Sequence, residues 1–288
     1  MIHINAIGIH NTTPDKQQPD LLRELKSVSG KVYRRSDHFI QLAILGAHMA
    51  VNKLSLSDKT AIYLTSGQGN ISVFQRLCEQ RCLQKFLPKP VDFINLLSNS
   101  AGFYVACHLG LRGKNLFLSH LDFPVQMTLL AAQNDLNLGK QKAILVGGVD
   151  EWLADQELSR KLLGVDATKT LGEGSNWLLI SAEAKGGLGT FDMASKGLDI
   201  NKLHERVASA AAGTYLAFST RFSDEEAAAI MAINGGCRRF DYEGSCGYYE
   251  TLPLYALNSF LTTKEGRLIH LDVKNGRYML MTVDNTKS

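Results

Sequence analysis

The sequence predicts an α/β fold in which a largely parallel or mixed sheet lies between layers of helices. The first half of the chain alternates short apolar runs, typical of buried strands, with segments whose apolar residues recur at helical spacing. Hydrophobic residues make up 45% of the 288 residues and charged residues 20%, which is typical of a globular protein and not of a disordered one. No repeat with a period of about 20 to 50 residues is present, which argues against solenoids and propellers.

The elements expected in the first half follow from this alternation. The helix that begins at Phe39 has Ser36-Asp37 as its N-cap, and the helix that ends near Asn137 is closed by Leu138-Gly139. Pro88 and Pro90 interrupt the pattern between two helices. The expected strands cover residues 2–9, 60–65, 115–120 and 142–146, and the expected helices cover 39–51, about 71–85, 98–111 and 125–137.

The second half is expected to hold shorter elements. Residues 162–176 are rich in Gly, Asp, Thr and Lys, which predicts a loop. The glycine turn at Lys185-Gly-Gly187 predicts a strand pair and a soft boundary between two halves, 1–185 and 186–288. Asn275-Gly276 predicts the turn of a closing hairpin. The remaining expected strands cover 177–181, 188–193, 214–218, 267–273 and 277–283, and the expected helices cover 201–211, 224–234 and 248–261.

Charge and cysteine usage narrow the class of protein. The net charge of +3 comes from 31 basic and 28 acidic residues, a balance too even to indicate nucleic-acid binding. No basic segment followed by an apolar core opens the chain, and no apolar run is long enough to span a bilayer, so we expect a cytoplasmic protein with free thiols. Cys78 and Cys82 could supply half of a metal site, but no second pair has matching spacing, so no metal or cofactor is predicted.

Four stretches, read in order, resemble a β-ketoacyl synthase. Each is short, and the order and spacing of the four carry the resemblance. It implies a thiolase-like, layered αβαβα fold with a shortened C-terminal half. The stretches are Arg35-Ser-Asp-His-Phe-Ile-Gln-Leu-Ala43, Lys89 to Asn95 continuing through Ser98-Asn-Ser-Ala101 to Leu109-Gly-Leu-Arg-Gly-Lys-Asn115, Leu138-Gly139 with Ala143 to Glu151, and Leu171-Gly-Glu-Gly-Ser-Asn-Trp-Leu-Leu-Ile180.

The resemblance also shows what is missing. A ketosynthase uses a Cys nucleophile at the N-terminal end of a buried helix, where the helix dipole lowers the pKa of the thiol. An ungapped match from Gly113 to Gly148 places Asp122 at that position, and no Cys lies between Cys107 and Cys237. Asp is a poor carbon nucleophile, so the resemblance implies that this chain does not condense acyl groups itself.

The partner residues of the nucleophile are absent as well. Two His residues, or a His and an Asn, stabilise the carbanion and the thioester oxyanion in the family. Beyond residue 120 this chain has only His204 and His270, and neither lies in a matching motif. The segment most like the second His motif, Glu243-Gly-Ser-Cys-Gly-Tyr-Tyr-Glu250, contains no His.

Loss of the nucleophile together with its partners resembles the chain-length factors of type II polyketide synthases, and most closely the compact subunits of bacterial aryl polyene synthases. The resemblance implies a heterodimer with an active β-ketoacyl synthase, which receives its chains from an acyl carrier protein. It implies a dimer interface along Asn115, Leu116, Phe117, Leu118, Ser119 and His120, and it places Phe93, Ile94 and Leu97 near the acyl tunnel of the partner.

Other interpretations of these residues stay open. His120 and Asp122 alternate along the chain and could act as an acid–base pair; the simpler alternative is that Asp122 caps the helix and His120 lies at the interface. Cys246, next to a glycine turn, could be a displaced nucleophile of a divergent condensing enzyme or acyltransferase. Phe93 and its neighbours could belong to the core. The chain could also be a homodimeric acyl-binding scaffold.

Overall fold

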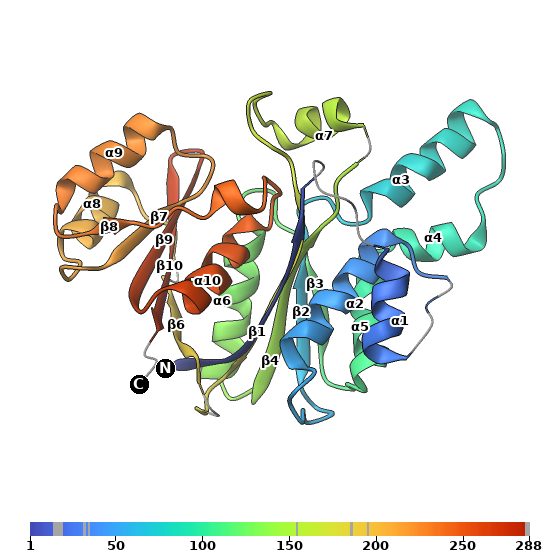
Figure 1. The fold of residues 1–288 in the computed structure, drawn as a ribbon, viewed down its shortest axis with the longest axis horizontal. Helices are drawn as coiled ribbons and strands as arrows, with labels where there is room; N and C mark the ends of the chain where they lie inside the picture. The colour runs from blue at the N-terminus through green and yellow to red at the C-terminus, as the bar shows by residue number, and fades with distance from the viewer. Residues whose placement is uncertain are drawn as a thin grey trace.

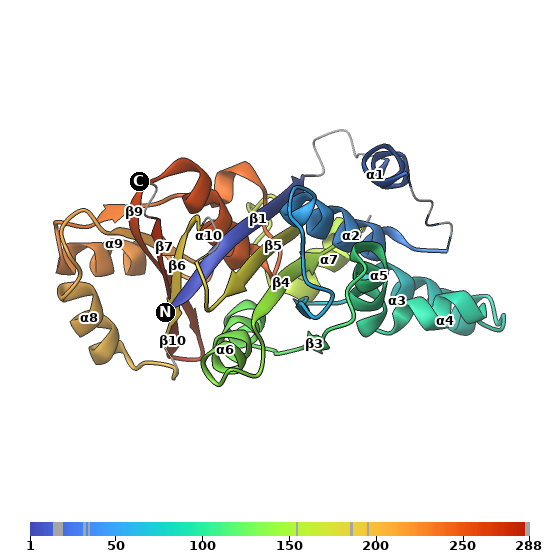
Figure 2. The same ribbon diagram turned by 90° about the horizontal axis from the view of Figure 1, so that it is seen from below.

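The computed structural model describes residues 1–13, 20–30, 33, 35–153, 155–184, 187–194 and 196–285. Within them a ten-stranded sheet has the order β3-β2-β4-β5-β1-β6-β10-β9-β7-β8. Helices α6 and α10 lie between the two halves of this sheet, whereas α1, α2 and α5 lie outside one half and α8 and α9 lie outside the other (Figures 1 and 2). The predicted αβαβα layering is therefore confirmed.

The first half of the chain supplies five strands. β2 pairs in parallel with both β3 and β4, whereas β5 runs antiparallel to β4 and to β1. All nine residues of β5 are buried, because helices cover both faces of the sheet at this point. The strands are β1 (Ile2–Thr12), β2 (Ala61–Thr65), β3 (Asn115–Leu118), β4 (Ala143–Asp150) and β5 (Glu173–Ser181).

The outer face of this half is covered by three helices. Asp37 caps α2, because its side chain accepts a hydrogen bond from the N–H of Ile40 at 3.2 Å, as the sequence predicted. α2 is apolar on nearly all sides and packs against β1, β4 and β5. The helices are α1 (Leu21–Ser29), α2 (His38–Val51) and α5 (Asn99–Leu109).

The second half also supplies five strands in the described part of the chain, the same number as the first half, although it is shorter. Asn275 and Gly276 have φ angles of 52° and 70°, which the type I′ turn of the predicted hairpin requires. The strands are β6 (Gly189–Met193), β7 (Tyr215–Phe218), β8 (Arg238–Arg239), β9 (Gly266–Lys274) and β10 (Arg277–Asn285); α8 (Ile200–Ala208) and α9 (Asp224–Ile233) cover them.

The central layer consists of α6 (Pro124–Asn137) and α10 (Leu252–Thr263). Both helices contact strands of both sheet halves, and their apolar side chains belong to one continuous core cluster. Burial of such a cluster is the main stabilising term for the fold. Both helices begin with proline in the first turn, where the missing N–H costs no helical hydrogen bond.

A helical arm extends beyond the sheet from the region around β3 and α5 (Figures 1 and 2). It consists of α3 (Ile71–Cys78), a π-helical turn η1 (Glu79–Leu83) and α4 (Pro90–Leu96). We call residues 71–97 the arm. Two further short elements, α7 (Gln156–Leu163) and the 3₁₀ turn η2 (Glu243–Ser245), lie at the end of the sheet where β4 and β5 are joined.

Several sequence predictions were wrong in detail. The strands predicted at 177–181 and 188–193 exist but do not pair with each other, because β1 lies between them. The predicted loop at 162–176 contains the end of α7 and the start of β5. The strand predicted at 115–120 ends at Leu118, and the helix predicted from residue 248 begins at Leu252. Helices α1 and α4 were not predicted.

Two further predictions concern the domain boundary and membrane-spanning helices. The predicted boundary at residue 185 lies outside the described residues, so the division into halves 1–185 and 186–288 stays a prediction. Among the helices of the described residues, none combines the length and the apolar character needed to cross a bilayer.

Candidate functional site

The turn between β3 and α6 holds the two polar residues singled out from the sequence. His120 Nδ1 accepts hydrogen bonds from the backbone N–H groups of Asp122 at 3.2 Å and Phe123 at 3.1 Å. The prediction that Asp122 caps the helix is therefore wrong, because the side chain of His120 takes up these N–H groups. The carboxylate of Asp122 instead lies 3.6 Å from the ammonium group of Lys274.

The N-terminal ends of the two central helices meet at Arg221, which follows β7. Its Nη1 donates to the carbonyl oxygen of Asp122 at 2.7 Å and lies 3.3 Å from both carboxylate oxygens of Asp272 on β9. Its Nη2 forms an ion pair with Glu250, which precedes α10. One guanidinium thus joins the start of α6, the start of α10 and strand β9.

Electrostatics favour the charged form of this guanidinium. Burial opposes its charge, but the carboxylates of Asp272 and Glu250 outweigh that effect and hold the pKa of Arg221 above its ordinary value. Gln126 on α6 donates to the second oxygen of Asp272 at 2.7 Å. We call Arg221, Asp272, Glu250 and Gln126 the arginine network. It provides charge neutralisation and hydrogen bonds, and both of its carboxylates are engaged by Arg221.

His270 lies behind the arginine network on β9. Its side chain is fully buried, and Nε2 is 2.9 Å from the hydroxyl of Tyr242. Burial lowers the pKa of this imidazole to about 4, so the ring is neutral at neutral pH. His204 is exposed on α8 in the outer layer. His270 is therefore enclosed and neutral, which does not suit an acid or base that must reach a substrate.

Cys246, the alternative nucleophile, is enclosed by the core. Its side chain is 1% exposed, and the sulfur lies 3.8 and 3.9 Å from the carbonyl oxygens of Tyr242 and Glu243. A reactive cysteine needs access and a positively charged neighbourhood. The surroundings of Cys246 are instead typical of a structural cysteine.

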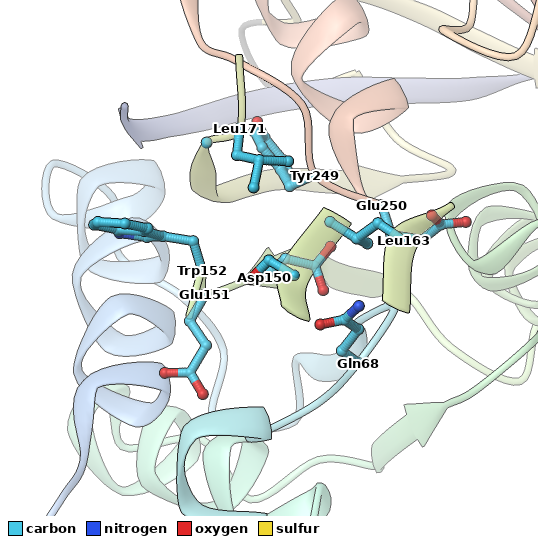
Figure 3. A pocket seen from close by; sticks show the side chains of 10 residues that line it. Gln68, Asp150, Glu151, Trp152, Leu163, Leu171, Tyr249 and Glu250 are labelled. Atoms are coloured by element: carbon cyan, nitrogen blue, oxygen red, sulfur yellow. The ribbon is translucent and has the colours of Figure 1, made fainter. Parts of the chain in front are cut away.

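A small cavity lies beside the arginine network, between the ends of β4 and α10. Asp150 projects into it together with Gln68, whereas Glu151 points away toward α3 (Figure 3). Its free volume is about 10 Å³, which suffices for roughly one water molecule and excludes an acyl chain. Asp150 accepts hydrogen bonds from Ser66 Oγ, the N–H of Gly67 and the N–H of Thr251 at 2.7, 2.8 and 2.7 Å. The carboxylate of Asp150 thus joins the turn after β2 to the residue that precedes α10.

The predicted interface strand lies at an edge of the sheet. Among the residues that the structure describes, β3 pairs only with β2, so its other side has no paired strand along Asn115 to Leu118. Asn115 is exposed and the three following residues are half-buried; Ser119 and His120 lie beyond the strand and are exposed. α5 packs closely behind β3, because a Cβ on Gly102 would lie 2.5 Å from Asn115 Oδ1. The edge is therefore firmly supported and free to pair.

The residues predicted to lie near the tunnel are on α4 or directly after it, and this helix buries polar side chains and exposes apolar ones. In α4 the polar residues Asp92 and Asn95 are only 7% and 4% exposed. Phe93, Ile94 and Leu97 are 60%, 54% and 49% exposed, so the suggestion that they belong to the core is wrong. The arm carries further exposed apolar residues on α3 and in the following turns, namely Phe74, Leu83, Phe86 and Leu87. The arm thus concentrates exposed apolar side chains within a short stretch of the chain.

No group of three or more His, Cys, Asp or Glu side chains in the described part of the chain is placed to hold a metal ion. Cys78 and Cys82 are both exposed on the arm, at the end of α3 and in η1. They lie near no second pair of ligands that the described residues provide. Two thiolates alone do not complete a tetrahedral zinc site.

Known proteins give a structural likeness but no sequence match. No model of a known protein family matches the chain, and no curated protein is similar to it. The ishigamide ketosynthase/chain length factor superimposes with a TM-score of 0.71 at 14% identity, covering 98% of each chain. AntDE:AntF, a type II PKS acyl-carrier protein in complex with its ketosynthase, gives 0.69 at 11% identity over 99% of each chain. A beta-ketoacyl synthase from Burkholderia phymatum STM815 gives 0.66 at 13% over 99% of each.

The chain has the thiolase-like fold of the ketosynthases. The fold expected from the four sequence stretches is thereby confirmed. Identities of 11 to 14% show the fold alone. That Asp122 replaces a nucleophile, and that β3 and α4 meet a partner, stay predictions.

The arginine network was not predicted from the sequence. Arg221, Glu250 and Asp272 are far apart in the sequence and belong to no motif. One signal pointed to it, since the segment ending at Glu250 was recognised as a His motif without its His. In the structure Glu250, the last residue of that segment, forms an ion pair with Arg221.

Proposed function

We propose that this chain is a non-catalytic, chain-length-factor-type subunit that forms a heterodimer with an active β-ketoacyl synthase. In this proposal β3 joins the partner's sheet, and the apolar face of α4 lies against the partner's acyl tunnel and limits or lines it. The reaction would take place in the partner. This subunit would set the shape of the space in which the chain grows.

The reversed polarity of α4 carries the proposal. A surface helix normally turns its apolar residues to the core, but here Asp92 and Asn95 face the protein while Phe93 and Ile94 face outward. Leaving such side chains in water lacks the stabilisation of about 1.5 to 3 kcal/mol that burial of each would give. An apolar partner surface would supply that burial, and the open edge of β3 would align it.

The arginine network supports the non-catalytic part of the proposal. A ketosynthase requires space for a thioester and a thiolate at the start of the central helix. Here Arg221 bonds to the carbonyl oxygen of Asp122 at the start of this helix. An open cleft of about 580 Å³ borders Arg221, Glu250 and Lys274, so the proposal rests on the carboxylate at this position and not on a lack of room. With Cys246 buried, no observation favours a divergent condensing enzyme or acyltransferase.

The carrier protein and the pathway belong to the same proposal. One of the similar structures holds an acyl-carrier protein in complex with its ketosynthase. We infer that a carrier protein delivers chains to the active partner of this subunit in polyketide biosynthesis, and specifically in an aryl polyene pathway. A cytoplasmic location stays a prediction.

The first test is co-expression with an active ketosynthase encoded near this chain, followed by size exclusion with light scattering. We expect a one-to-one complex, and a chain that aggregates when produced alone. A double variant Phe93→Asp/Leu97→Asp removes the apolar face and should abolish the complex without unfolding the chain, since both side chains are about half exposed or more. Ile200→Asp, at an exposed apolar position on α8, is the matched control and should leave the complex intact.

Two results would contradict the proposal. A stable homodimer that does not bind the ketosynthase would favour a homodimeric acyl-binding scaffold. Condensation or acyl transfer by the purified chain alone would show that it is an enzyme. If the complex forms, the product-length distribution of Phe93→Ala and Phe93→Trp complexes tests whether α4 borders the tunnel.

A further inference from the structure

The arm is held to the sheet by polar contacts more than by apolar burial. In α3 the buried side chains are Val73 and Leu77, and in α4 they are Asp92 and Asn95. Asn70 Nδ2 donates to Asp37 Oδ2 at 2.6 Å and to the carbonyl oxygen of Asn95 at 2.9 Å. Asn95 Nδ2 donates in turn to the carbonyl oxygen of Arg35 at 2.9 Å. These bonds connect both helices of the arm to the start of α2.

Glu151 adds a charged contact at the start of α3. It follows β4, is only 6% exposed, and accepts a hydrogen bond from the N–H of Ser72 at 2.8 Å. Asn70, the N-cap residue of α3, makes no capping hydrogen bond with its own side chain. A carboxylate from the sheet therefore caps this helix, where the N–H groups and the helix dipole favour negative charge. Figure 3 shows Glu151 pointing away from the cavity and toward α3.

The charge on Glu151 is costly in this place. Burial raises the pKa of Glu151 to about 7, and the hydrogen bond from Ser72 and the charge of His38 only partly oppose this. Asp37 on α2 adds repulsion. A glutamine could accept the same hydrogen bond without the desolvation cost. A costly group at the base of a segment with an outward apolar face suggests a role in holding that segment.

We propose that Glu151 is a positioning residue that locks the arm onto the end of β4, so that α4 presents Phe93, Ile94 and Leu97 at a fixed place. The purpose of the lock rests on the proposed function, since the partner's tunnel is what these side chains would meet. The lock itself is a property of the isolated chain. It can therefore be measured without a partner.

Hydrogen exchange of the full chain, followed by mass spectrometry, is the test. In Glu151→Ala the amides of α3 should exchange about 5-fold faster than in the wild type, the effect of losing one helix cap, while β4 and β10 keep their protection. Glu151→Gln keeps an acceptor and should restore protection to within about 2-fold. Ser223→Ala is the matched control, because Ser223 caps α9 by accepting from the N–H of Glu226 at 3.1 Å. It should loosen α9 and leave the arm unchanged.

A second variant guards against misfolding of Glu151→Ala. Ser72→Pro removes the donated N–H in the first turn of α3, where proline is tolerated, and leaves the buried carboxylate in place. It should speed exchange of α3 as Glu151→Ala does. Unchanged exchange of α3 in both variants, or acceleration spread evenly over the whole chain, would overturn the lock.

The two proposals fail in different ways. If the wild type binds the ketosynthase but Glu151→Ala leaves the exchange of α3 unchanged, the role proposed for Glu151 is wrong and the proposed function stands. If α3 loosens as expected but the wild type binds no ketosynthase, the lock is right and the proposed function is wrong. If both hold, Glu151→Ala should weaken the complex, and Glu151→Gln should restore it.

Discussion

The two ends of the sheet differ in length, charge and cover. At one end β8 has two residues, Arg238 and Arg239, and both are charged and exposed. Arg239 forms ion pairs with Asp241 at 2.7 Å and Asp224 at 3.7 Å, and the two guanidinium groups lie over the rings of Tyr215 and Phe218. Short, charged and covered edges prevent strands of other molecules from adding to a sheet.

At the other end β3 has the sequence Asn-Leu-Phe-Leu and no neighbour on its outer side. The apolar arm lies on the same side of the molecule (Figure 1). One protein thus protects one edge with several devices and leaves the other without them. The difference teaches that the two edges are treated differently, which is the contrast that the proposed pairing of β3 with a partner would explain.

The largest expected effect tests whether both ends belong to one cooperative unit. Arg221 joins the two central helices to β9, so Arg221→Met would leave Asp272 and Glu250 without their cation. We expect a loss of about 3 kcal/mol in the free energy of unfolding, measured by urea denaturation. Lys202→Met, which breaks an exposed ion pair with Asp199, is the control and should change it by less than about 0.5 kcal/mol. An equally small effect of Arg221→Met would show that the halves are held by apolar packing alone.

A pH titration sharpens the comparison on the side of the arm. The pKa of Glu151 rises from its ordinary 4.5 to about 7 in the folded chain, so the folded state binds this proton more tightly than the unfolded state. The resulting stability is present below pH 4.5 and is lost as pH rises to about 7. Glu151→Gln should therefore gain about 2 kcal/mol over the wild type between pH 5 and pH 8.

The charged groups around Glu151 determine how the titration is interpreted. Asp37 and His38 face it from α2, with Glu173 on β5 bonded to His38 at 2.7 Å and Arg76 on α3 near Asp37. His38, whose pKa is raised by Glu173, titrates in both proteins. The carboxylate of Glu151 is itself one of the charges that raise the pKa of His38, so the difference between the two denaturation curves reports Glu151 together with its coupling to His38. A constant difference from pH 5 to pH 8 would contradict the raised pKa.

A smaller effect is expected from opening the protected edge. Arg238→Val/Arg239→Val removes the charges and the ion pairs of β8 while keeping residues that favour strands. The variant should self-associate with rising concentration in analytical ultracentrifugation, whereas its free energy of unfolding should change by less than about 1 kcal/mol. If it stays as dispersed as the wild type, charge does not protect this edge, and the contrast with β3 loses its physical basis.

The smallest effect is expected from modification of the cysteines, which are distributed over both halves of the chain. Cys78, Cys82 and Cys107 are exposed, whereas Cys237 and Cys246 are buried. Brief treatment with iodoacetamide should add three groups to the folded chain and five to the unfolded chain, as read from the intact mass. Fast modification of Cys246 in the folded chain would revive its interpretation as a nucleophile.

The sequence located individual helices and strands better than it predicted which strands lie next to each other in the sheet. Period and capping located α2, α6, β2 and β4, because those signals are local. The pair expected at 177–181 and 188–193 failed because β1, from the other end of the chain, inserts between them. Buried polar residues hid the start of β5, where Glu173 and Asn176 are fully enclosed. Pro90 was taken as an interruption, although it opens α4.

The candidate site shows the same difference between local features, which the sequence predicted, and contacts of distant residues, which it did not. Motif spacing located the turn at Asp122 and the apolar residues of α4, which are local features. The arginine network could not be predicted from the sequence, because its charged residues lie after β7, on β9 and before α10 and meet only after folding. The reversal of α4 could have been suspected from its sequence, where Asp92 and Asn95 share a helical face opposite Phe93.

The place of β1 in the sheet has a consequence for how the chain is made. Residues 2 to 4 pair with β6 and residues 3 to 12 with β5, and every partner lies between Glu173 and Phe191. β1 is therefore synthesised well before any of its neighbouring strands exists. During that interval an apolar strand with two unpaired edges is open to the cell, a state that favours chaperone binding and aggregation. Synthesis at a temperature that slows aggregation, or alongside a partner that shields the nascent sheet, should raise the yield of folded protein more than any surface substitution.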